Sequence, residues 1–102
     1  RKLQEKWQPV VSKEPSLAEK VARLVALRNK DGCYGRLGED PAMGLCIEEF
    51  HNPLQRIFES YPRAVAMEQR MIEQLLGTRV IRRELPGGRT GQPRVIFEVA
   101  AA

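Results

Sequence analysis

The sequence has no apolar run that approaches the roughly 20 residues a membrane-spanning helix needs, so no span is expected. Residues 1–7, RKLQEKW, also lack the apolar stretch of a secretory signal peptide. We therefore expect a cytoplasmic protein. Because the chain begins at Arg1 rather than at a methionine, we also expect it to be a piece of a longer protein whose preceding part is absent.

Cysteine is scarce. Cys33 and Cys46 are the only two, which is too few for the disulfide scaffold of a small secreted protein. They do not form a CxxC pair, and a metal site at either one would need further ligands from elsewhere in the chain. We expect two free thiols that pack as small apolar side chains.

Few residues of the chain could act in catalysis. It has a single histidine, and no serine or cysteine is arranged with a base as a nucleophile would need. Glu48 and Glu49 are neighbours on a predicted strand, so they point to opposite faces and cannot act as a carboxylate pair. His51 follows that strand directly, where an imidazole could bind a metal, an anion or a ligand, although a structural role is favoured. We expect no enzyme.

Aromatic residues make up 6% of the chain, and none is interleaved with the arginines near its C-terminus, as a single-strand binding platform would require. Glu84 and Glu98 dilute this basic segment, and the net charge of the chain is only +4. A solvated hairpin face is therefore favoured, and a stand-alone polyanion or nucleic-acid binding module stays open as the alternative. The arginines concerned are Arg79, Arg82, Arg83, Arg89 and Arg94.

What the chain does contain is typical of a small soluble domain. Its 102 residues are 42% hydrophobic and 29% charged, which predicts one core and no internal domain boundary. A domain of this size buries a modest share of its surface, so its stability is readily raised by a partner, and we expect a homodimer.

Capping residues and apolar spacing predict a connector followed by three helices along the chain. Residues 1–15 contain two prolines and read as a connector with an apolar side, or as the end of a helix begun upstream. Ser16 and Glu19 fit a capping box, and Leu17, Val21, Leu24 and Val25 recur at helical spacing to about residue 29. Later helices are predicted from Asn52, as a cap, to about residue 60, and from residue 62 to 77, where a glycine supplies the left-handed end.

Two hairpins complete the prediction. Strands are expected at 33–37 and 45–50, joined by the loop 38–44, and at 78–85 and 94–99. The fold class is α+β, a four-stranded antiparallel sheet from two hairpins with helices on one face, in the order α-β-β-α-α-β-β. Alternation along the last strand directs Val95, Phe97 and Val99 at the helices. Residues 16–99 form the domain, and 100–102 are expected to be a disordered tail or a cloning remnant.

Several short pieces in this order resemble the C-terminal sensor region of winged-helix regulators of the iron–sulfur-assembly repressor type, in the broad ArsR/DeoR-like group. The pieces cover most of the chain and consist of 24–34 LVALRNKDGCY, 48–54 EEFHNPL, 67–68 ME, 75–77 LLG, 80–83 VIRR and the final strand.

The resemblance implies an iron–sulfur cluster held by three cysteines, one before a proline at the start of the helix after the second strand. The second lies three residues before a glutamate in the next helix, and the third in the last strand. The corresponding positions here are Asn52, Val65 and Val95. Amide and alkyl side chains cannot replace the thiolates that hold such a cluster, so we expect neither a cluster nor another cofactor, and no metal.

The function that the resemblance implies is an effector-sensing or dimerisation domain of a transcriptional regulator. DNA would be read by an upstream winged helix that is absent from this chain, and a small-molecule effector is the expected ligand. A metal-dependent enzyme is the least favoured alternative. The predicted pocket lies between the sheet and the two central helices, near His51, Asn52, Val65, Met67, Glu68, Val95 and Phe97.

Overall fold

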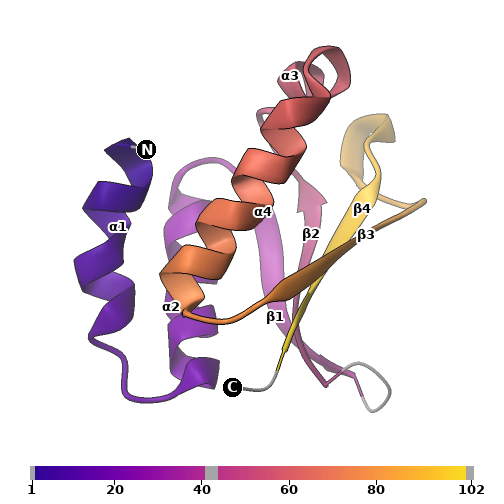
Figure 1. Ribbon diagram of the computed structural model, residues 1–102. Coiled ribbons are helices and arrows are strands. Elements are labelled where there is room, and N and C mark those ends of the chain that lie inside the picture. The colour runs from indigo at the N-terminus through magenta and orange to yellow at the C-terminus, as the bar shows by residue number, and fades with distance from the viewer. Residues whose placement is uncertain (1, 41–43, 101–102) are drawn as a thin grey trace.

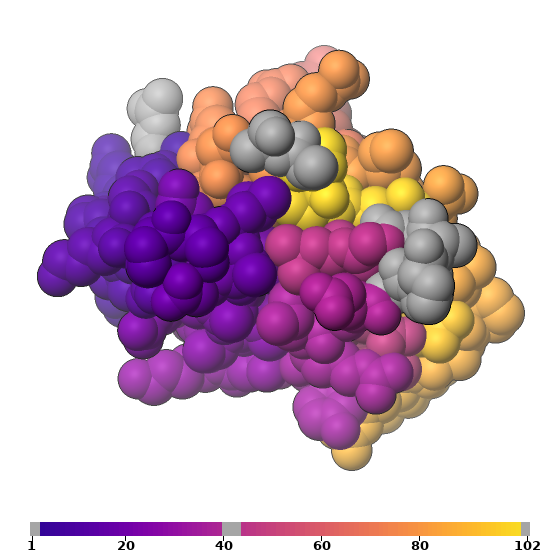
Figure 2. Space-filling model, turned by 90° about the horizontal axis from the view of Figure 1, so that it is seen from below, coloured from indigo at the N-terminus to yellow at the C-terminus, as the bar shows by residue number. Residues whose placement is uncertain are grey.

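Helices cover one face of a single sheet in the computed structural model, which describes residues 2–40 and 44–100 (Figure 1). Helices α2 (Leu17–Lys30) and α4 (Pro62–Leu76) pack against the strands, and α1 (Lys2–Ser12) lies against both of them. A short helix, α3 (Gln55–Ser60), packs on α4. Seen from below, α1 and α2 form one side of the molecule and the strands the other (Figure 2).

The sheet consists of β1 (Tyr34–Asp40), β2 (Gly44–His51), β3 (Val80–Leu85) and β4 (Arg94–Val99). The strand order is β1-β2-β4-β3 and every pairing is antiparallel, so two hairpins meet through β2 and β4. A 3₁₀ turn, η1 (Arg89–Gly91), interrupts the second hairpin's connection. The predicted α+β fold is confirmed. One further helix, α1, precedes the predicted order, and residues 41–43 of the predicted 38–44 loop lie outside the described residues.

Local signals account for most of the helix ends. Ser16 accepts a hydrogen bond from the backbone N–H of Glu19 at 3.1 Å, which confirms the predicted cap of α2. Gly77 adopts φ +74° and ends α4, as predicted. The side-chain oxygen of Asn52 bonds the N–H of Leu54, but α3 begins only at residue 55, so Asn52 closes a turn before that helix rather than capping it.

Helix α1 includes Pro9, which cannot donate a helical backbone hydrogen bond. The helix persists there because Trp7 and Val11 are buried on one face, and this burial offsets the missing bond. In the sequence the same segment carried only the signals of a connector or of a helix end. The segment becomes a helix because it packs against α2 and α4, which lie outside it in the sequence.

The core lies between the helices and one face of the sheet. Val95, Phe97 and Val99 all belong to it, as the alternation along β4 predicted. The opposite face carries ion pairs along and between strands, including Arg36 with Glu48 at 2.8 Å. The core cluster consists of Trp7, Val11, Val21, Leu24, Val25, Ile47, Ile72, Leu75, Leu76, Val80, Val95, Phe97 and Val99.

None of the helices in the described part of the chain is both long enough and apolar enough to pass through a lipid bilayer.

Candidate functional site

A charged side chain, Arg28, lies in the otherwise apolar interface between α2 and the sheet. It follows Leu24 by four residues and Val25 by three, and this spacing places it on the buried face of the helix. Only 3% of its surface is exposed. A buried guanidinium requires charged partners, because an unpaired charge in a protein interior is strongly unfavourable.

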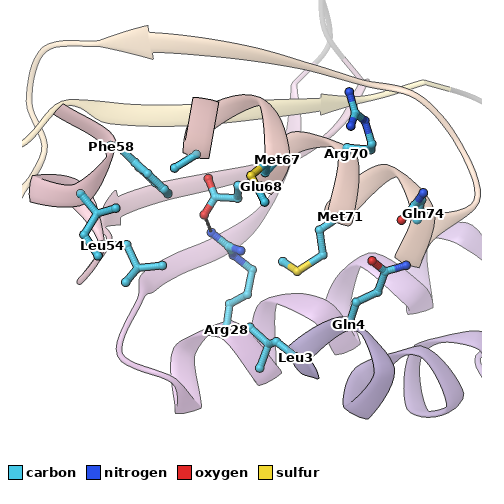
Figure 3. A pocket seen from close by; sticks show the side chains of 12 residues that line it. Leu3, Gln4, Arg28, Leu54, Phe58, Met67, Glu68, Arg70, Met71 and Gln74 are labelled. Atoms are coloured by element: carbon cyan, nitrogen blue, oxygen red, sulfur yellow. Dashed lines mark hydrogen bonds and ion pairs between the residues drawn. The ribbon is translucent and has the colours of Figure 1, made fainter. Parts of the chain in front are cut away.

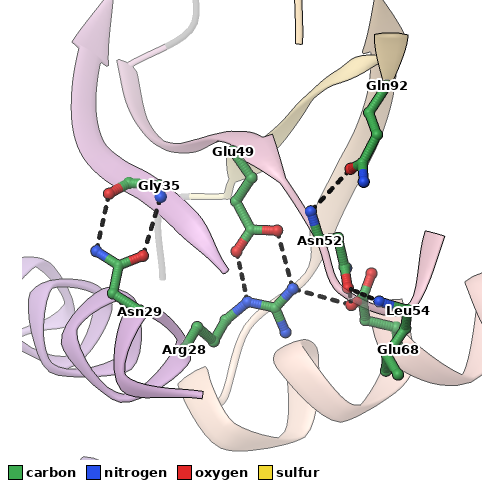
Figure 4. A network of polar contacts seen from close by, with 8 residues as sticks. All are labelled: Arg28, Asn29, Gly35, Glu49, Asn52, Leu54, Glu68 and Gln92. Carbon is green, nitrogen blue, oxygen red and sulfur yellow. Dashed lines mark hydrogen bonds and ion pairs between the residues drawn. The ribbon is translucent and has the colours of Figure 1, made fainter. Parts of the chain in front are cut away.

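Two carboxylates supply that pairing (Figure 4). Glu49 on β2 accepts from Nε of Arg28 at 2.5 Å and from Nη2 at 2.9 Å, a bidentate pair. Glu68 on α4 accepts from the same Nη2 at 2.9 Å. Arg28 therefore ties α2, β2 and α4 together, and its Cζ lies 5.9 Å from the ring centre of Phe97 on β4.

Asn52 extends this network to the end of β2. Its side-chain Nδ2 donates to Oε2 of Glu68 at 3.0 Å, while its backbone N–H donates to the side chain of Gln92 at 2.9 Å. Gln92 directly follows η1, so the network reaches the connection that leads into β4. We call Arg28, Glu49, Asn52 and Glu68 the interior polar cluster.

The interior polar cluster shifts two pKa values. Burial by itself would lower the pKa of Arg28, but the hydrogen bond with Glu49 and the charges of Glu49 and Glu68 outweigh it, so the pKa is raised and Arg28 stays charged. Burial, aided by the same two carboxylates, raises the pKa of Cys33 to about 12 although Arg28 opposes the shift. The Cys33 thiol is therefore protonated at neutral pH and a weak nucleophile.

A cavity of about 400 Å³ opens between α1, α3 and α4, with Arg28 and Glu68 among its lining residues (Figure 3). Apolar side chains form most of its wall, and Gln4, Arg70 and Gln74 add polar groups. We call it the helical cavity. Its lining consists of Leu3, Gln4, Arg28, Leu54, Ile57, Phe58, Ala64, Met67, Glu68, Arg70, Met71 and Gln74.

A smaller cavity of about 100 Å³ is also lined by Arg28 and Glu68. It shares four lining residues with the helical cavity, Leu3, Arg28, Leu54 and Glu68, and adds Cys33 and Asn52 among others. Arg28 and Glu68 of the interior polar cluster line both cavities and Asn52 lines the smaller one, which makes this region the candidate site.

The residues of the predicted pocket separate into two groups. Met67 and Glu68 line the helical cavity, and Asn52 and Glu68 line the smaller one. Val95 and Phe97 are buried in the core instead, and His51 and Val65 are half-buried and line neither cavity. The structure therefore brings Asn52 and Glu68 together in one hydrogen-bonded network.

Sequence reasoning did not single out Arg28, and it considered Glu49 only as a member of a carboxylate pair, not as part of the site. Both carried a signal, since Arg28 continues the apolar spacing of its helix and Glu49 shares a strand face with Ile47. Two charges of opposite sign on faces that are otherwise apolar indicate a buried ion pair. Glu48, on the other face of β2, pairs with Arg36 and Arg94, so the two glutamates have separate environments, as the strand alternation predicted.

The residues present do not fit an iron–sulfur cluster. Asn52 uses its side chain in bonds to Glu68 and Leu54, Val95 is buried in the core, and Val65 has no donor atom. Cys33 lines the smaller cavity, but a single protonated thiol cannot hold iron. Within residues 2–40 and 44–100, no group of three or more histidine, cysteine, aspartate or glutamate side chains is placed to bind a metal ion.

No family model matches the chain, and no curated protein matches it. The site combines apolar walls, a buried ion pair and an amide side chain.

Proposed function

We propose that this chain is the effector-sensing or dimerisation domain of a transcriptional regulator related to the iron–sulfur-assembly repressors, without their cluster. DNA would be read by a winged helix outside the printed sequence. The observation that carries the proposal is the helical cavity with the interior polar cluster at its floor. Glu68 lines this cavity and accepts a hydrogen bond from Asn52, which stands at one of the three positions where the resemblance expects a cluster ligand.

The mechanism would be a coupling between the cavity and α1. Leu3 and Gln4 line the helical cavity from α1, while Glu68 and Met71 line it from α4. An occupant would therefore contact both helices and favour the arrangement in which they lie at the separation it needs. A ligand shifts an equilibrium only through such a difference in contacts. A shift of α1 would be the route by which an occupant acts on the proposed DNA-reading domain.

The alternative, polyanion binding by the C-terminal hairpin, has less support. Arg82 pairs with Glu84 at 2.7 Å, Arg83 pairs with Glu98, and Arg94 pairs with Glu48 at 3.0 Å. Three of the five arginines of the alternative are thus already paired within the chain, and a phosphate backbone would compete with their internal partners.

A gel-shift experiment tests the proposal. The 102-residue chain is titrated into double-stranded DNA at several salt concentrations, in parallel with the product of the complete gene. We expect no binding by the chain and clear binding by the complete product, whose coding sequence before Arg1 should contain a helix-turn-helix. Salt-sensitive binding by the chain itself would support the polyanion module, because phosphate contacts release counterions. A complete product that does not bind DNA would overturn the proposal.

A further inference from the structure

The guanidinium of Arg28 leaves part of its hydrogen-bonding capacity unused. Nε and Nη2 donate to Glu49 and Glu68, whereas Nη1 donates to no residue in the described part of the chain. Figure 4 shows this third nitrogen pointing away from Glu49. Arg28 is almost fully buried and lines both cavities. Among the described residues, the side-chain nitrogen and oxygen atoms that are fully buried without a partner are Nε of Arg82 and Nε of Arg94, so Nη1 of Arg28 is not sealed in the interior. An occupant of a cavity that Arg28 lines can therefore accept a hydrogen bond from Nη1 in place of water.

Glu68 offers the complementary capacity. Both hydrogen bonds that the carboxylate accepts from described residues, from Arg28 and Asn52, end on the same oxygen, Oε2. Its second oxygen is therefore left to accept a bond from a ligand, and Glu68 lines the helical cavity and the smaller one. The floor of the site thus presents a donor and an acceptor side by side.

The charges around this floor cancel. Arg28 and Arg70 are positive and Glu68 is negative among the lining residues of the helical cavity, and Glu49 is negative directly behind Arg28. An anionic ligand would meet two carboxylates, and a cationic ligand would meet two guanidinium groups. Neither gains a net attraction that offsets its own loss of hydration.

The remaining wall of the helical cavity is mainly apolar and includes Ile57; Leu54 and Phe58 lie on one side of it, and Met67 and Met71 belong to α4 (Figure 3). Its volume of about 400 Å³ falls in the lower part of the range for small-molecule pockets, about 300–1,000 Å³. Methionine side chains adapt readily to a ligand of irregular shape.

We propose that the helical cavity binds an uncharged, mainly apolar small molecule whose polar end is an amide or a hydroxyl. That group accepts a hydrogen bond from Nη1 of Arg28 and donates one to Glu68, while the apolar part lies against α3 and α4. That this molecule is the effector of the regulator rests on the proposed function. That the cavity binds such a molecule is tested separately, without DNA.

Four probes that share one phenylpropyl body test the preference for an uncharged polar end. Hydrocinnamamide and hydrocinnamyl alcohol are uncharged, hydrocinnamylamine is a cation and hydrocinnamate an anion. Each is titrated into the ¹⁵N-labelled 102-residue chain, with two-dimensional NMR as the readout. We expect the amide and the alcohol to shift resonances of α1, α3 and α4, and to bind about tenfold more tightly than either charged probe. No localised shift by any probe, or equal affinity for all four, overturns the proposal.

Two alanines on α4 provide a matched pair of variants. Ala64 lines the helical cavity, whereas Ala66 is exposed and does not. Ala64→Leu fills part of the cavity and should weaken hydrocinnamamide at least tenfold, while Ala66→Leu should leave its affinity unchanged. Equal weakening by both variants would place the binding site elsewhere and contradict the assignment.

Glu68→Gln provides a second test that does not depend on cavity size. The amide keeps the shape and can still accept from Arg28, but it removes one negative charge from the floor. We expect hydrocinnamate to gain affinity relative to hydrocinnamylamine, which a purely structural role of Glu68 would not produce. An unchanged ratio between the affinities of the two charged probes overturns the proposal. If the cavity binds hydrocinnamamide but the complete gene product does not bind DNA, only the proposed function fails.

Discussion

At the scale of single residues, Arg28 connects three elements in the interior of this protein, α2, β2 and α4. Its guanidinium bonds carboxylates from β2 and α4, and all three side chains are at least nine-tenths buried. The cost of removing such charges from water is repaid only by close pairing, so loss of one member leaves the others in an unfavourable environment. The three elements that meet at Arg28 therefore depend on one side chain.

Arg28→Met should lower the free energy of unfolding by about 3–5 kcal/mol, because Glu49 and Glu68 would stay buried without their cation. Urea unfolding followed by circular dichroism measures the change. Arg23→Met is the matched control on the same helix, since Arg23 is half exposed and pairs with Glu14 at 3.0 Å at the surface. The control should cost at most about 1 kcal/mol. Equal losses for the two variants would contradict a special role of Arg28.

Cys33 should make stability depend on alkaline pH. Burial raises its pKa from 9.0 to about 12, so the thiol of the unfolded chain releases its proton first as pH rises. The stability that Cys33 contributes is complete below pH 9 and is lost between pH 9 and about 12. Urea unfolding of the native chain and of Cys33→Ala at a series of pH values checks this.

Relative to Cys33→Ala, the native chain should lose stability as the pH rises above 9. The difference between the two proteins isolates this thiol from lysine and tyrosine side chains, which titrate in both. Parallel pH profiles would show that Cys33 is not shifted.

At the scale of elements, α1 is the helix whose existence depends most on its neighbours. Its sequence contains Pro9, and its own propensity is weak, but Trp7 and Val11 enter the same core as α2 and α4. Short helices in proteins owe most of their stability to such packing. The helix also brings Leu3 to the wall of the helical cavity.

Trp7→Ala should destabilise the protein by about 3–5 kcal/mol, because it leaves a large cavity between α1, α2 and α4. Thermal unfolding by circular dichroism gives the change, since the variant lacks the only tryptophan and cannot be followed by its fluorescence. Val10→Ala tests the exposed side of the same helix and should change stability far less. If truncating Trp7 has no effect, α1 does not belong to the core.

The boundaries of the other elements followed from the sequence to within a few residues. Ser16 and Gly77 terminate helices by local backbone chemistry, which neighbouring residues alone specify. Asn52 shows the limit of such reasoning. It has the composition of a cap, but its side chain is shared between Leu54 and Glu68, and the second partner comes from another helix. A distant hydrogen bond cannot be read from local spacing.

At the scale of the whole molecule, the residues that would bind iron in the resembling regulators are an amide and two alkyl groups. The chain, expressed with ample iron and purified without oxygen, should contain far less than one iron and one acid-labile sulfide per molecule. Treatment with a chelator should leave its melting temperature unchanged, since no stability would come from metal binding. Stoichiometric iron, or a clear loss of stability on chelation, would contradict the argument from the missing thiolates.

The sequence by itself determined the α+β class, the two hairpins and the inward face of β4, because periodicity and capping act over a few residues. It also singled out Asn52, Met67 and Glu68 as candidates. Only the tertiary structure decided that Arg28 and Glu49 join them and that the candidate cavity lies between α1, α3 and α4. The reason is physical. A buried charge is tolerated only where the fold brings opposite charges to it, and those charges lie 21 and 40 residues away along the chain.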